Sequence, residues 1–187
     1  MQPKTSADFD SEYRLPFTMW GDVRVPKEIS ALVAEGAPRR ALELGCGVGR
    51  FSRYVAQQGV ATTGVDFSSV AISNARASVA KDERKPEFIV GDVTQLDRVA
   101  GPFDISFDVG CFHCLDSAGQ RKYVSEVHRL LVPGGVHLIW AFDNSPGGPR
   151  LSPVSMQEVF APGFQLRDSR KTRRRLLASH WYWLKAC

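Results

Sequence analysis

The sequence predicts an α/β fold in which a seven-stranded, mostly parallel sheet carries helices on both faces and includes an antiparallel C-terminal strand. Strand-length apolar runs alternate with helical patterns along the chain, which is typical of a doubly wound parallel sheet. The first apolar run leads directly into a glycine-rich loop, and several runs end in an acidic residue. Because parallel strands end at the same edge of a sheet, we expect these acids to share one edge.

The helices follow from apolar periodicity and from their start and stop residues. Phe9, Tyr13 and Phe17 repeat every four residues and predict a helix, which should stop near Leu15 because Pro16 follows it. Residues 1–8 are polar, and we expect them to fray. Further helices are expected at 26–36, 48–58, 68–75, 118–131 and 154–160, with a short helical turn at 94–98.

The strands fill the intervals between these helices. Glycine at Gly36 and Gly59 closes two helices, and Pro133-Gly134-Gly135 is expected to end the long helix before the fifth strand. Strands are expected at 40–44, 61–66, 87–90, 104–109, 136–142, 164–169 and 179–185.

Length and composition favour one soluble domain. The 187 residues can form a single core, and we expect a single domain over 1–187, with an N-terminal helical lid segment at 1–36 and the sheet core at 37–187. No apolar stretch is long enough to span a bilayer, and the N-terminus has no apolar signal region. Four cysteines give no disulfide framework in a chain of this size, so we expect a reducing, cytoplasmic location and no membrane partner.

The net charge of +4 is concentrated in residues 167–175, which read Arg-Asp-Ser-Arg-Lys-Thr-Arg-Arg-Arg. A basic run can form a nucleic-acid surface. This one lacks interleaved aromatic residues that could stack on bases. We therefore favour a solvated hairpin between the two C-terminal strands and expect no nucleic-acid partner, while the oligomeric state stays open.

The loop after the first strand, Gly45-Cys46-Gly47-Val48-Gly49, is suited to a nucleoside-like ligand. Glycines let a ligand approach the backbone, and the helix that follows offers unpaired N–H groups. Arg50 stands where the dinucleotide fingerprint requires its third glycine, which excludes that fingerprint. The next strand ends in Asp66, and a carboxylate in that place suits the hydroxyl groups of a ribose.

Acids end nearly every core strand. Glu43, Asp66, Asp92 and Asp108 stand at or just after the ends of the first four expected strands. Their uniform charge predicts a ligand rich in hydrogen-bond donors at this edge of the sheet.

From Arg40 to Trp140, this succession of motifs resembles class I S-adenosylmethionine-dependent methyltransferases, which have a single-domain Rossmann-like fold. The resemblance implies S-adenosyl-L-methionine as cofactor and S-adenosyl-L-homocysteine as product. It places the loop glycines against the methionine part, Asp66 on the ribose, Phe67 on the adenine, and Asp92 with the Val93 amide at the adenine amino group. The full set of cofactor residues that it implies is Trp20, Glu43, Gly45, Cys46, Gly47, Asp66, Phe67, Gly91, Asp92, Val93 and Asp108.

A narrower resemblance begins at the stretch from Phe107 to Asp116 and continues through Pro133-Gly134-Gly135 to the tail His180-Trp181-Tyr182-Trp183. It is similar to small bacterial methyltransferases related to the thiopurine, tellurite and halide/thiol enzymes. That group methylates N, O or S of small, often heterocyclic or toxic molecules by in-line displacement. The resemblance implies an acceptor pocket formed by Tyr13, Phe17, Cys111, Phe112, His113 and Phe142.

His113 is the candidate for orienting or deprotonating the acceptor, with Asp108 as a second catalytic candidate, because histidine can adopt either charge state near neutral pH. A structural histidine that fixes the loop is an equal alternative. Cys111, His113 and Cys114 could suggest zinc or redox chemistry, but a structural zinc needs four ligands and no second cluster is present, so we expect no metal. A nucleic-acid methyltransferase using residues 167–175 and a non-catalytic cofactor-binding scaffold stay open as alternative functions.

Overall fold

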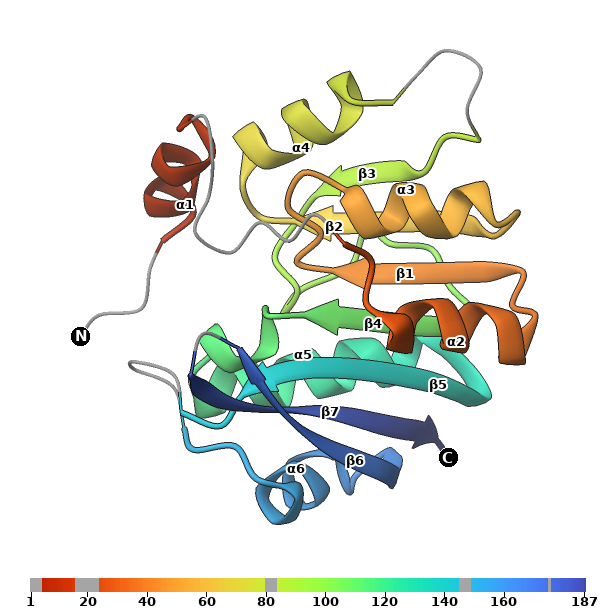
Figure 1. The fold of residues 1–187 in the computed structure, drawn as a ribbon, viewed down its shortest axis with the longest axis vertical. Coiled ribbons are helices and arrows are strands. Elements are labelled where there is room, and N and C mark those ends of the chain that lie inside the picture. Colours follow the sequence, from red (N-terminus) through yellow and green to blue (C-terminus); the bar gives the residue numbers. More distant parts are fainter. Residues whose placement is uncertain (1–4, 16–23, 80–83, 145–148, 175) are drawn as a thin grey trace.

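The computed structural model describes residues 5–15, 24–79, 84–144, 149–174 and 176–187, and its centre is one seven-stranded sheet (Figure 1). The strand order is β3-β2-β1-β4-β5-β7-β6. Neighbouring strands are parallel except for β7, which runs antiparallel to both β5 and β6. The strands are β1 (Arg40–Leu44), β2 (Ala61–Asp66), β3 (Glu87–Val90), β4 (Phe103–Val109), β5 (Leu131–Phe142), β6 (Phe164–Arg174) and β7 (Leu177–Ala186). The expected fold is confirmed, including the antiparallel C-terminal strand.

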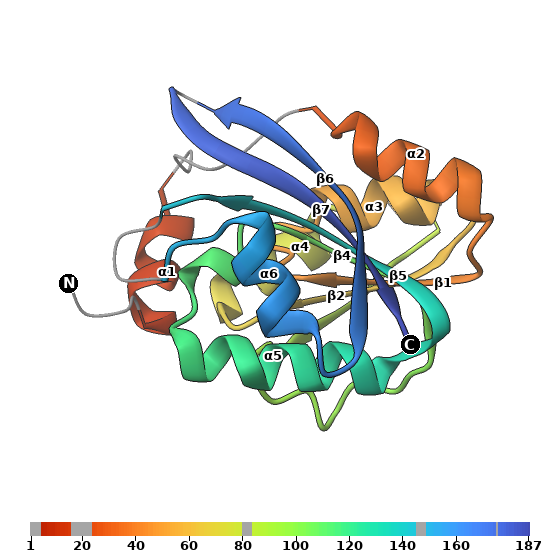
Figure 2. The same ribbon diagram turned by 90° about the horizontal axis from the view of Figure 1, so that it is seen from below.

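Helices cover both faces of the sheet (Figure 2). One face is packed by α2, α3 and α4, and the other by α5 and α6, so the core forms two main apolar clusters separated by the sheet. The helices are α1 (Ser6–Tyr13), α2 (Lys27–Gly36), α3 (Arg50–Gln57), α4 (Ser69–Ala77), α5 (Ser117–Leu130) and α6 (Pro153–Phe160). No helix in the described part of the chain combines the length and the apolar character needed to traverse a bilayer.

The N-terminal helix begins earlier than the sequence predicts. α1 starts at Ser6, inside the stretch expected to fray, because Thr5 and Asp8 form a reciprocal capping box that satisfies the first backbone N–H groups. It ends at Tyr13 and has no buried residue. α1 is therefore held by contacts at its surface, chiefly with α4.

The helical turn expected at 94–98 is wrong, since residues 93–98 form turns around an isolated bridge between Asp92 and Gln95. Two side chains divert the backbone N–H groups from helical bonding. Asp92 Oδ1 accepts from the N–H and the hydroxyl of Thr94, each at 2.8 Å, and Glu126 of α5 accepts from the Leu96 N–H at 2.8 Å. The second of these partners lies far away in the sequence.

The Pro133-Gly134-Gly135 segment lies within β5, whereas the sequence placed it at the end of the preceding helix. α5 ends at Leu130 and β5 begins at once with Leu131. The segment forms an irregularity in the strand pairing, where β4 pairs first with Leu131 and then with Val136. The strand absorbs the glycines as a bulge.

The basic run is also placed differently from its prediction. Residues 167–174 belong to β6, the edge strand of the sheet, and pair with β7 instead of forming the connecting hairpin. The pairing of β6 with β7 shifts in register between Leu166 and Asp168. As a result, the side chains of Asp168, Arg170 and Arg174 lie on the same face of the sheet as Trp181. Long charged side chains on an edge strand also discourage pairing with another chain.

Candidate active site

The glycine loop between β1 and α3 is shaped by left-handed backbone conformations. Gly45 has a φ of 67° and Gly47 a φ of 53°, which residues with a Cβ rarely adopt. A Cβ on Gly45 would lie 2.5 Å from the Cβ of Cys111, and a Cβ on Gly47 would lie 2.7 Å from the hydroxyl oxygen of Tyr13. The loop therefore contacts the segment after β4 on one side and α1 on the other.

Asp66 joins this loop to the end of β2. Its Oδ2 accepts from the Gly47 N–H at 2.8 Å and its Oδ1 accepts from the Ser68 N–H at 2.9 Å. Burial raises the pKa of Asp66, while these two N–H groups oppose the change. The structure thus brings Asp66 and the glycine loop together, as the sequence predicts.

Glu43, on β1, is bonded to α3, the helix that follows the glycine loop. Its Oε2 accepts from the backbone N–H of Ser52 at 2.7 Å and from the Ser52 hydroxyl, which fixes the first turns of α3 against β1. Burial raises the pKa of Glu43 to about 8, assisted by the nearby carboxylates of Asp66 and Asp108. The partners of Glu43 are internal, and its contact with a cofactor stays a prediction.

Asp108 and Phe112 have no exposed surface, so burial argues against their predicted ligand contacts, which stay predictions. Asp108 accepts from the N–H groups of Cys111 and Phe112 at 2.7 and 2.8 Å, which makes it the organiser of the loop after β4. The Phe112 ring packs in the core, with its centroid 5.3 Å from that of Phe160 in α6. The tight turn set by Asp108 directs Phe112 inward and leaves Cys111 and His113 nearer the edge of the sheet.

A buried hydrogen-bonded chain continues from Asp108 into the core. Tyr123 donates its hydroxyl to Asp108 at 2.9 Å and lies 3.1 Å from Nε2 of His137, whose Nδ1 lies 2.8 Å from the Ser106 hydroxyl. Since the Tyr123 hydroxyl proton goes to Asp108, Nε2 of His137 carries the proton and Nδ1 accepts from Ser106. Burial lowers the pKa of His137 to about 3, which agrees with a neutral ring. Sequence reasoning missed this chain; its signal was a histidine inside an apolar strand.

His113 lies in an aromatic cluster at the end of β4. Its ring centroid is 5.2 Å from that of Phe142 and 6.1 Å from that of Trp140, both on β5. Its side chain is 7% exposed, and within the described residues its Nδ1 has no hydrogen-bond partner. Burial, together with the positive charge of Arg174, lowers the pKa of His113 to about 4. His113 is therefore neutral at physiological pH and is a weak base.

α1 lies over the glycine loop and the start of α4. The Phe9 ring centroid is 5.1 Å from that of Phe67, the residue expected to pack on an adenine. Asp10 accepts from the Ser68 hydroxyl at 2.5 Å and from the Val70 N–H at 3.3 Å, so it adds a second acid at the N-terminus of α4. Tyr13 reaches the loop, as the Gly47 geometry shows, so α1 lies against Gly47 and Phe67, two of the predicted cofactor residues.

The other predicted site residues differ in exposure. Asp92 is exposed and follows half-buried Gly91, whose N–H donates to the carbonyl of Asp66 at 3.0 Å. Cys46 and Val93 are buried in the core. Phe142 and Cys111 are half-buried, and burial raises the pKa of the Cys111 and Cys46 thiols, which disfavours reactive thiolates there. Phe17 and Trp20 lie outside the described residues.

His180 has a partner that the sequence did not reveal. Its Nδ1 lies 2.7 Å from Oδ1 of Asp143, and its ring stacks on Tyr182 with centroids 5.6 Å apart. The contact joins the end of β5 to β7, since β7 carries both His180 and Tyr182. Nothing in the spacing of the two residues, which are 37 positions apart, predicts the pair.

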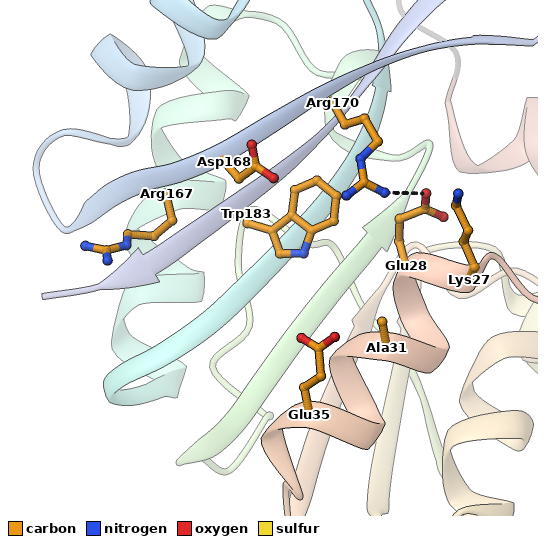
Figure 3. A pocket seen from close by; sticks show the side chains of 8 residues that line it. All are labelled: Lys27, Glu28, Ala31, Glu35, Arg167, Asp168, Arg170 and Trp183. Carbon is orange, nitrogen blue, oxygen red and sulfur yellow. Dashed lines mark ion pairs between the residues drawn. The ribbon is translucent and has the colours of Figure 1, made fainter.

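A separate groove of about 490 Å³ lies between α2 and the β6–β7 pair (Figure 3). Trp183 lines the groove, and Arg170 lies over this ring and pairs with Glu28 at 3.5 Å. The groove contains none of the predicted site residues; its lining consists of Lys27, Glu28, Ala31, Glu35, Arg167, Asp168, Arg170 and Trp183. Among the residues with described positions, no group of three or more metal-ligating side chains is close enough to hold a metal ion.

Comparison with known proteins gives a family match over the region that holds the glycine loop, Asp66 and the β4 loop. The family model described as "Methyltransferase domain" matches residues 41–135, half of the chain. An uncharacterised methyltransferase of Schizosaccharomyces pombe is 30% identical over 89 residues, which cover 48% of this chain and 61% of that protein. The 2-heptyl-1-hydroxyquinolin-4(1H)-one methyltransferase of Mycobacteroides abscessus is 26% identical over 145 residues, which cover 75% of this chain and 64% of that protein. The chain thus spans about three fifths of the length of these relatives.

A solved structure resembles the whole fold. It is the 1,6-didemethyltoxoflavin-N1-methyltransferase of Burkholderia thailandensis, which contains bound 1,6-didemethyltoxoflavin and S-adenosylhomocysteine. The two chains are 26% identical with a TM-score of 0.79, and the match covers 97% of this chain and 86% of that chain.

Proposed function

Because the chain belongs to the methyltransferase domain family, we propose that it transfers a methyl group from S-adenosylmethionine to N, O or S of a small molecule. The names of two similar proteins give 2-heptyl-1-hydroxyquinolin-4(1H)-one and 1,6-didemethyltoxoflavin as their methyl acceptors, and both names support a small acceptor. We also propose that the chain forms one domain over residues 1–187, with 1–36 acting as the lid, and that its acceptors resemble those of the thiopurine, tellurite and halide/thiol group.

The observation that carries this proposal is the pairing of the glycine loop with Asp66. The Gly47 N–H donates to Asp66, so a hydrogen bond joins the loop to the end of β2 at the carboxyl edge of the sheet. Side chains are excluded from the loop at Gly45 and Gly47, since a Cβ at either position would clash. Ligands bind at this edge in open parallel sheets.

The residues of the chain take distinct roles in the proposed complex. Gly45 and Gly47 border the amino acid part of the cofactor, Asp66 accepts from the ribose hydroxyls, and Phe67 packs on the adenine. Asp92 and the Val93 amide recognise the adenine edge. When bound, the cofactor supplies a methyl group on a positively charged sulfur, which a nucleophile can attack without prior activation. The protein therefore has to align the acceptor and exclude water.

His113 takes a positioning role in this proposal. Because the pKa of His113 is lowered to about 4, its neutral imidazole is a poor general base at neutral pH. The neutral ring can still orient an acceptor through a hydrogen bond. We propose no metal, and no nucleic acid as acceptor. Within the basic strand, Arg170 lies over Trp183 and pairs with Glu28, so this cation already has partners within the protein.

The test is calorimetric titration of S-adenosylhomocysteine into the wild-type protein and two variants. Asp66→Asn should weaken binding by roughly tenfold or more, because the ribose hydroxyls lose a charged acceptor. Glu35→Gln is the matched control, an exposed carboxylate at the end of α2 and away from the carboxyl edge of the sheet. Equal affinities for the three proteins, or no binding by the wild type, would reject the proposed cofactor site.

A further inference from the structure

The cluster of His113, Trp140 and Phe142 lies next to the proposed cofactor loop. Cys111, two residues before His113, is the residue that a Cβ on Gly45 would strike. The three rings contact one another, with Trp140 and Phe142 centroids 4.8 Å apart at an interplanar angle of 66°. Trp140 and His113 are buried, whereas Phe142 is half-buried and presents the accessible ring of the cluster. A flat aromatic molecule has a surface to stack on here.

A positive charge faces this cluster. The Arg174 guanidinium carbon lies 5.2 Å from the centroid of the Trp140 ring, and its charge contributes to the lowered pKa of His113. The causes of that shift include no carboxylate. Asp108 accepts from the Cys111 N–H of its own loop, and Asp143 lies 2.7 Å from Nδ1 of His180. The local electrostatic field therefore favours an anion and disfavours a protonated amine.

His113 brings an unused hydrogen-bonding atom to the same place. His113 is only 7% exposed, and its Nδ1 has no hydrogen-bond partner within the described chain. Leaving such an atom unpaired is costly, so a bound group that pairs with it gains binding energy. In a neutral imidazole one nitrogen carries the proton, and an anion selects the form with the proton on Nδ1.

We propose that the methyl acceptor is a planar aromatic or heteroaromatic molecule that binds as its anion against Phe142, with Arg174 and the Nδ1–H of His113 facing its negative charge. This inference rests on the proposed function and specifies its substrate class. The acceptor loses its proton to solvent before or during binding. Its lone pair then forms a bond to the methyl carbon while the carbon–sulfur bond breaks toward sulfur, so that no proton moves in the transfer step itself.

The test uses 4-nitrophenol, which ionises near neutral pH, and benzylamine as a cationic probe of similar size. Binding is followed by quenching of tryptophan fluorescence between pH 5 and 9. The affinity for 4-nitrophenol should rise with the ionisation of the probe, and benzylamine should bind at least tenfold more weakly. Of the groups that face His113, the rings of Trp140 and Phe142 do not ionise, and Arg174 keeps its charge throughout this range.

Arginine variants test whether the charge of Arg174 binds the nitrophenolate anion. Arg174→Gln should weaken nitrophenolate binding roughly tenfold, as expected for the loss of a contact to a charged group, and Arg174→Lys should retain most of the affinity. Arg173→Gln is the matched control, since Arg173 is exposed on the same strand and points to the opposite face. Equal effects of Arg173→Gln and Arg174→Gln, a preference for benzylamine, or no binding of nitrophenolate would overturn the inference.

Calorimetry with S-adenosylhomocysteine on the same preparations separates this inference from the proposed function. Intact cofactor binding with methyl transfer to amines alone overturns the substrate class and leaves the methyltransferase assignment standing. Absence of cofactor binding overturns the assignment itself.

Discussion

Replacement of Glu43 by glutamine should remove a large part of the pH dependence of stability. Burial raises the pKa of Glu43 to about 8, from an ordinary value of 4.5. The native protein therefore keeps a proton on Glu43 that the unfolded chain releases above about pH 4.5. The resulting stability is fully present at low pH and is lost as the pH rises toward 8. Glutamine is uncharged at every pH and keeps an oxygen that can accept from Ser52.

The magnitude follows from the width of this pH window. Each pKa unit corresponds to about 1.36 kcal/mol, so between pH 5 and 8 the contribution of Glu43 to the free energy of unfolding falls by up to about 4 kcal/mol. The glutamine variant lacks this decline. A constant offset between the two proteins, of about 1–3 kcal/mol, would report the cost of burying an amide NH₂ without a partner.

The assay is urea unfolding followed by tryptophan fluorescence at pH 5, 6, 7 and 8. The free energy of unfolding of the wild type should fall relative to Glu43→Gln across the series, while Glu35→Gln should follow the wild type, because Glu35 is exposed. Parallel curves for wild type and Glu43→Gln would refute the argument. An internal role for Glu43 also predicts similar affinities of both proteins for S-adenosylhomocysteine.

Three further predictions concern the loop after β4 and its supports. Gly45→Ala should lower the free energy of unfolding by about 2–4 kcal/mol, because it combines a left-handed backbone with a clash at Cys111; an unchanged melting temperature would contradict this. Tyr123→Phe should cost about 1–3 kcal/mol in urea unfolding, since the N–H of His137 loses its acceptor, and a neutral effect would argue against the assigned proton positions. Asp108→Asn should cost at least about 2 kcal/mol and make the loop more sensitive to limited proteolysis, because an NH₂ group replaces an acceptor of backbone N–H groups; wild-type resistance would show that the loop is held by other contacts.

The sheet could be predicted from the sequence because its signals are local. Alternating apolar runs and helical patterns mark the core elements, and β2 and β3 occupy the residues expected for them. The predictions failed where distant groups intervene. The turn at 94–98 depends on Glu126, which is 30 residues away from Leu96. β6 extends through a charged run because pairing with β7 outweighs the weak strand preference of arginine and lysine.

The site was predicted where the backbone itself forms it. Glycine positions and a terminal acid are enough to place Asp66 beside Gly47. The direction in which each side chain points was harder to predict. Exposure alone separates a side chain that can contact a ligand from one that packs in the core. Phe112 and His113 are neighbours in the sequence, yet the first has no exposed surface and packs in the core, while the second joins the aromatic cluster near the edge. The turn that divides them is set by Asp108, whose partners cannot be assigned from spacing.

The way α1 is attached has a consequence for the speed of the proposed reaction. This helix buries none of its residues and is held by the ring contact of Phe9, the carboxylate of Asp10 and a bond from Asn74 to the Tyr13 carbonyl at 3.3 Å. The spent cofactor keeps its adenosine, so on the proposed assignment it leaves when α1 lifts from Phe67. We predict that the opening of this helix sets the rate of product release and, through it, the rate of turnover. Increasing the solvent viscosity would slow the steady-state rate and leave the first turnover unchanged.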